Sequence, residues 1–154
     1  RAELIEIFGE QVYNDNGELD RARLAAEVFG NSERLAALNG AVHPAVGRDW
    51  ERWCEERRGE GARYTILESA ILFDCGFDSK VDRTVTVSAP EALRIERAAA
   101  RDNAPTEVIR RRIEAQMSDT EREARADYTI TNTDRDTVQK QVEELHAKFS
   151  NEVE

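Results

Sequence analysis

Lysine is scarce in this sequence, and so is any surplus of positive charge. Of its 154 residues, 22 are basic, and 19 of these are arginine against three lysines. With 32 acidic residues the net charge is −10. This balance argues against general binding to nucleic acid, which needs a positive surface. No apolar run approaches the roughly 20 residues of a membrane span, so we expect no membrane partner.

Cysteine and histidine are equally sparse. The cysteines, Cys54 and Cys75, form no C-x-x-C pair, and the only histidines are His43 and His146. A zinc site and a hydrolytic triad are therefore disfavoured, and we expect no resident metal site. Two cysteines without such spacing favour reduced thiols in a cytoplasmic protein, and a disulfide between them is the alternative.

Glycine is present but forms neither common phosphate-binding loop. The eight glycines build no G-x-G-x-x-G and no G-x-x-x-x-G-K-[ST] within these residues. What the sequence does have is 40% hydrophobic and 35% charged residues, which is typical of a folded domain.

The first 61 residues predict helices, because apolar side chains recur there with a helical period. One short helix is expected over residues 32–38 and a longer one over 46–57. Between them, Asn39-Gly40 leads to Pro44, which predicts a turn with the proline at a first helical position.

Strand-like runs appear in the second part of the chain, at residues 64–67, 81–87 and 128–131. Helical patterns separate the last two of them, which indicates an α/β domain with a parallel sheet. Parallel sheets need both faces covered, and three short strands make a thin one. The sequence also begins without Met inside a helical pattern. We therefore expect a single incomplete domain, 1–154, whose N-terminal strands are missing.

Arginine gathers between residues 94 and 125. This window holds eight arginines against seven carboxylates, so its charge is +1 while the rest of the chain carries −11. Arg94, Arg97 and Arg101 follow at i, i+3 and i+7 and so share one helix face. Such a face can neutralise a polyphosphate. From spacing alone, a solvated face balanced by Glu96 and Asp102 is the alternative.

Two further residues could take part in chemistry. Glu68 stands where the first strand is expected to end, and ligands of doubly wound sheets bind beyond the carboxyl ends of strands. A carboxylate there can hold Mg²⁺ or a substrate hydroxyl, with an ordinary strand-end acid as the alternative. His43 can bond a phosphate or hydroxyl or act as a base, although a histidine satisfied by backbone is the more common case.

The order of short motifs resembles the dephospho-coenzyme A kinase family. The motifs are F-G, G-x-L-D-R-x-x-L, V-F, L-N-x-x-x-H-P, F-(D/E)-x-G, E-R-x-x-x-R-D, R-I-x-x-Q and A-D-Y-x-I-x-N. They stand, in that order, at Phe8-Gly9, Gly17 to Leu24, Val28-Phe29, Leu38 to Pro44, Phe73 to Gly76, Glu96 to Asp102, Arg112 to Gln116 and Ala126 to Asn132. The sequence departs from the family after the first expected strand, where P-L-L is usual and this sequence has Ser69-Ala70-Ile71-Leu72.

The resemblance implies an α/β, three-layer P-loop kinase fold with a parallel sheet. It implies a helical substrate-binding region over 1–61 and a mobile lid over about 94–125. The implied activity is transfer of the ATP γ-phosphate to the ribose 3′-hydroxyl of dephospho-coenzyme A, the last step of coenzyme A biosynthesis, with ATP and Mg²⁺ as cofactors. In the family the phosphate-binding loop precedes the part that this sequence matches, so we expect these 154 residues alone to be inactive.

The resemblance also assigns roles to residues. Arg97 and Arg101 are expected to contact ATP and to stabilise charge during transfer, as catalytic residues. Arg112 is expected to bind ATP from the lid, and Asn132 begins the loop that holds adenine.

The substrate side is assigned to Asn39 and His43, which belong to the helical region facing coenzyme A, and to Glu68 near the acceptor nucleotide. Two alternatives stay open. The first is another nucleoside or nucleotide kinase of the same fold. The second is a non-catalytic binding module whose arginines pair with an acidic partner or are merely solvated.

Overall fold

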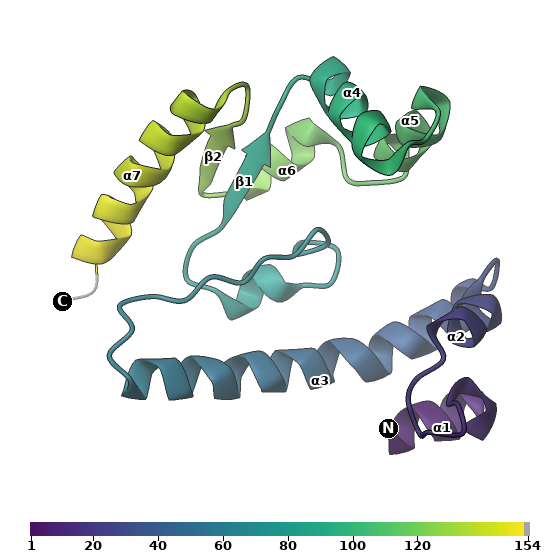
Figure 1. The fold of residues 1–154 in the computed structure, drawn as a ribbon. Helices are drawn as coiled ribbons and strands as arrows, with labels where there is room; N and C mark the ends of the chain where they lie inside the picture. Colours follow the sequence, from purple (N-terminus) through teal and green to yellow (C-terminus); the bar gives the residue numbers. More distant parts are fainter. Residues whose placement is uncertain (153–154) are drawn as a thin grey trace. The chain divides into compact units, whose positions relative to one another are not determined.

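The computed structural model describes residues 1–152, and the chain divides into two compact units, Arg1–Gly59 and Glu60–Glu154 (Figure 1). Within residues 1–152, no helix combines the length and the apolar character that crossing a membrane requires.

The first unit is helical. It contains α1 (Ala2–Phe8), the short 3₁₀ helix η1 (Glu10–Val12), α2 (Arg21–Val28) and α3 (Ser32–Gly59). Its core is a cluster of three buried side chains, Phe8, Val12 and Leu24. The carboxylate of Asp20 accepts the backbone N–H groups of the next turn and thereby starts α2.

The turn predicted over residues 39–44 is wrong, because α3 runs without a break through it and contains Pro44. Proline inside a helix costs about 3 kcal/mol, since it lacks an N–H to donate. Leu38, Val42 and Val46 nevertheless follow at four-residue spacing, so the apolar stripe continues across the proline. Leu38 also packs against the core cluster of this unit. The helix α3 therefore forms despite the local turn signal.

The second unit contains a parallel pair of strands, β1 (Val85–Ser88) and β2 (Tyr128–Thr131). Three helices connect them: α4 (Glu91–Asp102), α5 (Thr106–Glu114) and α6 (Asp119–Arg125). The 3₁₀ helix η2 (Phe77–Lys80) precedes β1, and α7 (Arg135–Asn151) follows β2. Helix α6 packs against β1 and α7 against β2 (Figure 1).

The α/β class with a parallel sheet is confirmed, but the three predicted strands are not all formed. Residues 64–67 form no strand, because no other strand within residues 1–152 pairs with them. An extended run becomes a strand only when its backbone groups find a ladder partner. Glu68 therefore follows an irregular segment and is exposed.

The strand predicted over residues 81–87 begins later, at Val85, and its buried side is the polar one. Thr84 and Thr86 are only 8% and 5% exposed, whereas Val87 is 56% exposed. The hydroxyl of Thr84 donates to Asp127 Oδ2 at 2.7 Å, and the Thr84 backbone N–H donates to the same oxygen at 2.7 Å. Side chains do alternate between the two sides of this run, but hydrogen bonding to neighbouring polar groups decides which side is buried.

Candidate active site

A pocket of about 270 Å³ lies where the two parallel strands end. Its lining joins the last part of β1 to the exposed face of α4 and to the first residue after β2: Val87, Ala89, Arg94, Arg97, Ala98, Arg101 and Asn132. The carboxyl ends of parallel strands are where α/β folds bind ligands. The three arginines reach one pocket because their spacing places them on one face of α4, as predicted.

Arg97 is held by the loop that follows β2. Its guanidinium donates from Nη1 to the backbone oxygen of Asn132 at 3.0 Å and to Asn132 Oδ1 at 3.1 Å. It also donates from Nη2 to the backbone oxygen of Thr133 at 2.8 Å. Asn132 is itself tied to β1, because its N–H donates to the backbone oxygen of Ser88 at 2.7 Å. Arg97 thus fixes the loop at the rim of the pocket.

Arg101 and Arg112 meet on one carboxylate, and we call these three residues the Asp102 cluster. Asp102 accepts from Arg101 Nε at 2.7 Å and Nη2 at 3.3 Å, and from Arg112 Nη1 at 2.8 Å. Hydrogen bonding from Arg101, with a smaller contribution from Arg112, lowers the pKa of Asp102 below its ordinary value. Arg112 does not line the pocket, but Asp102 links it to Arg101, which does.

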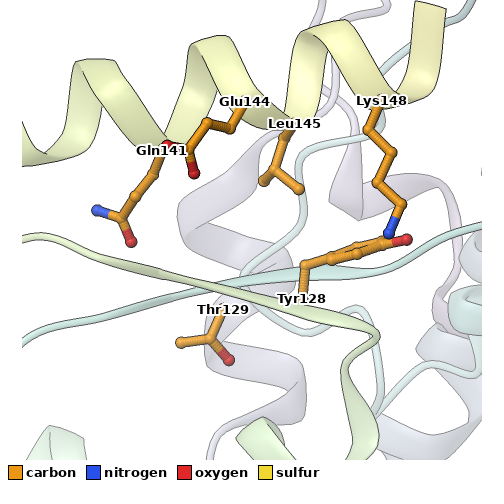
Figure 2. A pocket seen from close by; sticks show the side chains of 6 residues that line it. All are labelled: Tyr128, Thr129, Gln141, Glu144, Leu145 and Lys148. Atoms are coloured by element: carbon orange, nitrogen blue, oxygen red, sulfur yellow. The ribbon is translucent and has the colours of Figure 1, made fainter. Parts of the chain in front are cut away.

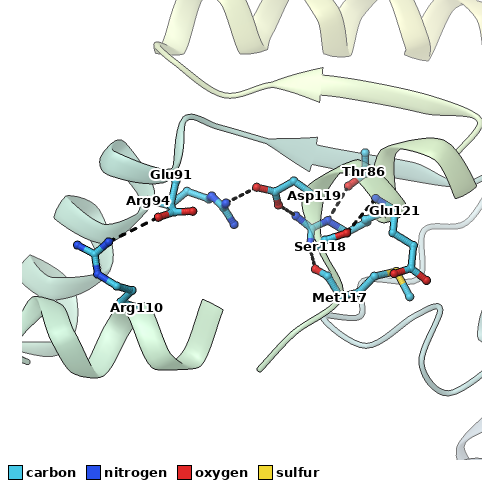
Figure 3. A network of polar contacts seen from close by, with 9 residues as sticks. Thr86, Glu91, Arg94, Arg110, Met117, Ser118, Asp119 and Glu121 are labelled. Atoms are coloured by element: carbon cyan, nitrogen blue, oxygen red, sulfur yellow. Dashed lines mark hydrogen bonds and ion pairs between the residues drawn. The ribbon is translucent and has the colours of Figure 1, made fainter. Parts of the chain in front are cut away.

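Arg94 belongs to a second group, the Asp119 cluster, which contains Arg94, Asp119 and Arg122. Both arginines form ion pairs with Asp119. Figure 3 shows Arg94 reaching across to Asp119 at the start of α6. Arg122 also donates from Nε to the buried hydroxyl of Thr86 at 3.2 Å and from Nη1 to the backbone of Met117 at 3.3 Å. This cluster joins α4, α6 and β1.

A larger hollow of about 370 Å³ lies between β2 and α7, but its chemistry is poorer (Figure 2). Its one cationic side chain, Lys148, stands over the ring of Tyr128 with Nζ 4.6 Å from the centroid. Hydrogen bonding with Tyr128 raises the pKa of Lys148 above its ordinary value. The cation is therefore engaged by the protein itself, so we take the arginine-lined pocket as the candidate active site.

The remaining predicted residues lie elsewhere. Asn39 and His43 are half-buried on α3 in the first unit, four residues apart and so on one helix face. Glu68 is exposed in the irregular segment that precedes η2. Among residues 1–152, no three metal-ligating side chains gather into a cluster.

The two shared carboxylates are what the sequence reasoning missed. From sequence, Asp102 is only an acid that balances a solvated arginine face, and Asp119 has no assigned role. A usable signal was present for Asp102, because a carboxylate at the end of a helix is disfavoured by the helix dipole unless cations compensate it. The adjacent Arg101 in the E-R-x-x-x-R-D motif supplies one such cation.

Comparison with known proteins settles the family. A family model for dephospho-CoA kinase matches residues 1–138, which include α4, α5, α6 and the loop after β2. This chain belongs to the dephospho-CoA kinase family. The family resemblance seen in the motifs is thus confirmed.

Individual relatives agree with this family. The dephospho-CoA kinase of Corynebacterium diphtheriae is 38% identical over 153 residues, which is 99% of this chain and 76% of that protein. That of Bacteroides fragilis is 40% identical over 147 residues, covering 96% of this chain and 70% of that protein. A crystal structure from Thermus thermophilus matches 96% of this chain and 75% of its own, with 33% identity and a TM-score of 0.76. The chain thus spans about three quarters of the length of these relatives.

Proposed function

We propose that the protein is a phosphotransferase that uses ATP to phosphorylate the ribose 3′-hydroxyl of dephospho-coenzyme A, in a three-layer P-loop kinase fold. The observation that carries the proposal is the arginine-lined pocket at the strand ends, with Arg97, Arg101 and Asn132 on its rim. Membership of the dephospho-CoA kinase family supports the choice of acceptor.

The donor set of the pocket fits ATP. Arg101 has an exposed side chain, 77% accessible, and its Nη1 group has no acceptor within residues 1–152. A guanidinium with free N–H groups binds phosphate oxygens and neutralises the charge that spreads over them during transfer. ATP, when bound, supplies the γ-phosphoryl group. We assign Arg101 to its phosphates and the loop at Asn132 to adenine, with Arg97 holding that loop.

Within residues 1–152, no group of three or more His, Cys, Asp or Glu side chains is placed to hold a metal ion. Kinases generally take ATP as a complex with Mg²⁺, and that ion keeps mostly phosphate oxygens and water as ligands. The metal requirement we propose is therefore that of the nucleotide complex.

The substrate side of the proposal rests on the family resemblance. We assign Asn39 and His43, in a helical region over 1–61, to the coenzyme A moiety, and Glu68 to the acceptor nucleotide. Residues 94–125 form the lid in this proposal. Because the 154 residues hold no phosphate-binding loop motif, we propose that they do not turn over substrate by themselves.

The test uses the full-length protein with ATP and Mg²⁺ and measures ADP formation with dephospho-coenzyme A or with nucleoside monophosphates as acceptor. We expect turnover with dephospho-coenzyme A and a product phosphorylated on the 3′-oxygen. Preference for a nucleoside monophosphate would make the protein another nucleotide kinase. No ADP with any acceptor would reject a kinase function, and turnover by residues 1–154 alone would reject the claim of inactivity.

A further inference from the structure

We propose that Asp102 is a positioning residue for phosphate binding: by holding Arg101 and Arg112 on one carboxylate, it presents the unused N–H groups of both arginines to one polyphosphate. The inference rests on the proposed function and deepens it. It concerns a residue to which the motif comparison assigned no role.

The bonding pattern leaves donors available on both arginines. Arg101 binds Asp102 through Nε and Nη2, and Arg112 binds it through Nη1 alone. A guanidinium has five N–H groups. Within residues 1–152, no other acceptor takes the Nη1 group of Arg101 or the Nη2 group of Arg112. Each arginine can therefore bind the carboxylate with one edge and a phosphate with another.

The place of Asp102 in the fold argues that its charge is required. It is the last residue of α4, and Asn103 ends the helix in the left-handed region with φ +48°. The helix dipole disfavours a carboxylate at this end. The Asp102 side chain is nevertheless only 25% exposed, and two cations from α4 and α5 converge on it. An acid that served only solubility would not need this enclosure.

Charge arithmetic gives the reason for the arrangement. Without the carboxylate, two like charges on long, exposed side chains would repel one another and sample many rotamers. With it, the group keeps one net positive charge and both guanidinium groups are fixed before the ligand arrives. Preorganisation of this kind strengthens binding of a charged group because less ordering is needed on binding.

The test compares three variants of the full-length protein: Asp102→Asn, Glu107→Gln and Asp119→Asn. Glu107→Gln is the control matched in charge, since within residues 1–152 Glu107 pairs with Arg111 alone, on the exposed side of α5. The readouts are the dissociation constants of inorganic tripolyphosphate and of adenosine, and the KM of ATP. A merely structural role for Asp102 would weaken adenosine and tripolyphosphate binding alike.

We expect Asp102→Asn to weaken tripolyphosphate binding about tenfold and to raise the KM of ATP similarly, with adenosine binding changed less than twofold. Glu107→Gln should change none of the three constants, and Asp119→Asn should lower stability because it removes the shared acceptor of Arg94 and Arg122. Asp102→Glu, which restores the charge, should recover part of the affinity. Unchanged or tighter tripolyphosphate binding by Asp102→Asn, or equal losses for both ligands, would overturn the inference.

The outcomes also separate this inference from the proposed function. Kinase activity in the wild-type protein with no deficit in Asp102→Asn would reject the inference and keep the function. A protein without kinase activity that shows the tripolyphosphate deficit would reject the function and keep the inference. A wild-type protein that neither turns over nor binds tripolyphosphate would reject both.

Discussion

The Asp102 cluster and the Asp119 cluster use the same chemistry, two arginines on one aspartate, in different surroundings. In the Asp119 cluster the arginines are about a quarter exposed, at 23% and 24%. In the Asp102 cluster they are 77% and 58% exposed. The Arg122 guanidinium donates to Asp119, Thr86 and Met117. Arg101 and Arg112 each have N–H groups without an acceptor within residues 1–152. The enclosed cluster joins secondary structure elements, and we propose that the open one receives a ligand.

The comparison teaches that an arginine count does not identify an anion site. Both clusters come from the same arginine-rich window of the sequence. Burying an ion pair makes the removal of one partner costly. Exposing it makes the pair weak for stability but available for binding. Substitutions in the two clusters should therefore affect different properties.

The largest effect is expected from Arg101→Met in the full-length protein. We predict a fall in kcat of about 10³-fold, because a positioned arginine that stabilises the transferred phosphoryl group contributes at least this much in related reactions. The urea midpoint of unfolding should stay unchanged, because the side chain is mostly exposed. Steady-state kinetics and urea titration measure both. A lower midpoint with normal turnover per folded molecule would make Arg101 structural.

Arg122→Met should have the opposite signature. The change leaves the buried Thr86 hydroxyl without its Nε donor and removes one of two cations from Asp119. We predict a loss of about 2 kcal/mol in the free energy of unfolding, in the range for breaking a largely buried polar network. The kinetic constants of the folded fraction should be unchanged. Loss of turnover with an intact urea midpoint would mean that the two clusters had been assigned the wrong way round.

Sequence reasoning recovered the parts of this molecule that depend on local pattern. The helical face with Arg94, Arg97 and Arg101 follows from i, i+3 and i+7 spacing alone, and β2 was placed over Tyr128–Thr131 because its β-branched run is short and bounded. The same reasoning failed at Pro44, because α3 runs through a strong local turn signal and packs Leu38, on its N-terminal side, against the core of the first unit. Local signals are weak wherever packing is extensive.

What the sequence could not supply is which partner each polar group finds. Thr84 and Thr86 are polar residues of a kind that commonly faces solvent in a strand, but contacts with Asp127 and Arg122, about 40 residues away, bury them. Which arginines bind Asp102 and which bind Asp119 is likewise set by tertiary contacts, because it depends on how α5 and α6 pack beside α4. The roles of Asn39, His43, Glu68 and the pocket arginines stay predictions.

Arg97→Lys tests the boundary between the two clusters, because Arg97 is exposed yet held by three hydrogen bonds to the loop after β2. Lysine keeps the charge but cannot reproduce the three bonds to Asn132 and Thr133. We predict an approximately tenfold rise in the KM of ATP with kcat reduced only a few-fold, since the loop is displaced and the phosphate site is not. Thr133→Ala is the control, because its backbone oxygen remains. A fall in kcat as large as that of Arg101→Met would assign Arg97 to the phosphates.

The smallest expected effect is a change of stability at acid pH. It concerns the hydrogen bonds between Asp127 and Thr84, which join the starts of the two strands and which we call the Asp127 clamp. Hydrogen bonds from the Thr84 hydroxyl and backbone N–H lower the pKa of Asp127 in the folded protein. A lowered folded pKa contributes stability that is present above the unfolded value, about 3.9, and is lost as the pH falls through the folded value. The wild-type protein should therefore have a Tm above that of Asp127→Asn at pH 6, with the difference shrinking below about pH 4.

The response to salt should distinguish the Asp127–Thr84 pair from the Asp102 cluster. The pKa of Asp102 is lowered mainly by its hydrogen bond from the Arg101 guanidinium. The strongest bonds to Asp127 come from the neutral groups of Thr84, whereas both partners of Asp102 are cations on exposed side chains. Ions at about 1 M shorten the screening length to about 3 Å, which weakens exposed charge pairs far more than short bonds from neutral donors. The Tm difference between wild type and Asp127→Asn at pH 6 should therefore persist in 1 M NaCl, while any difference for Asp102→Asn should disappear. If both Tm differences fell equally in 1 M NaCl, the Asp127 clamp would depend on attraction between charged groups, as the Asp102 cluster does.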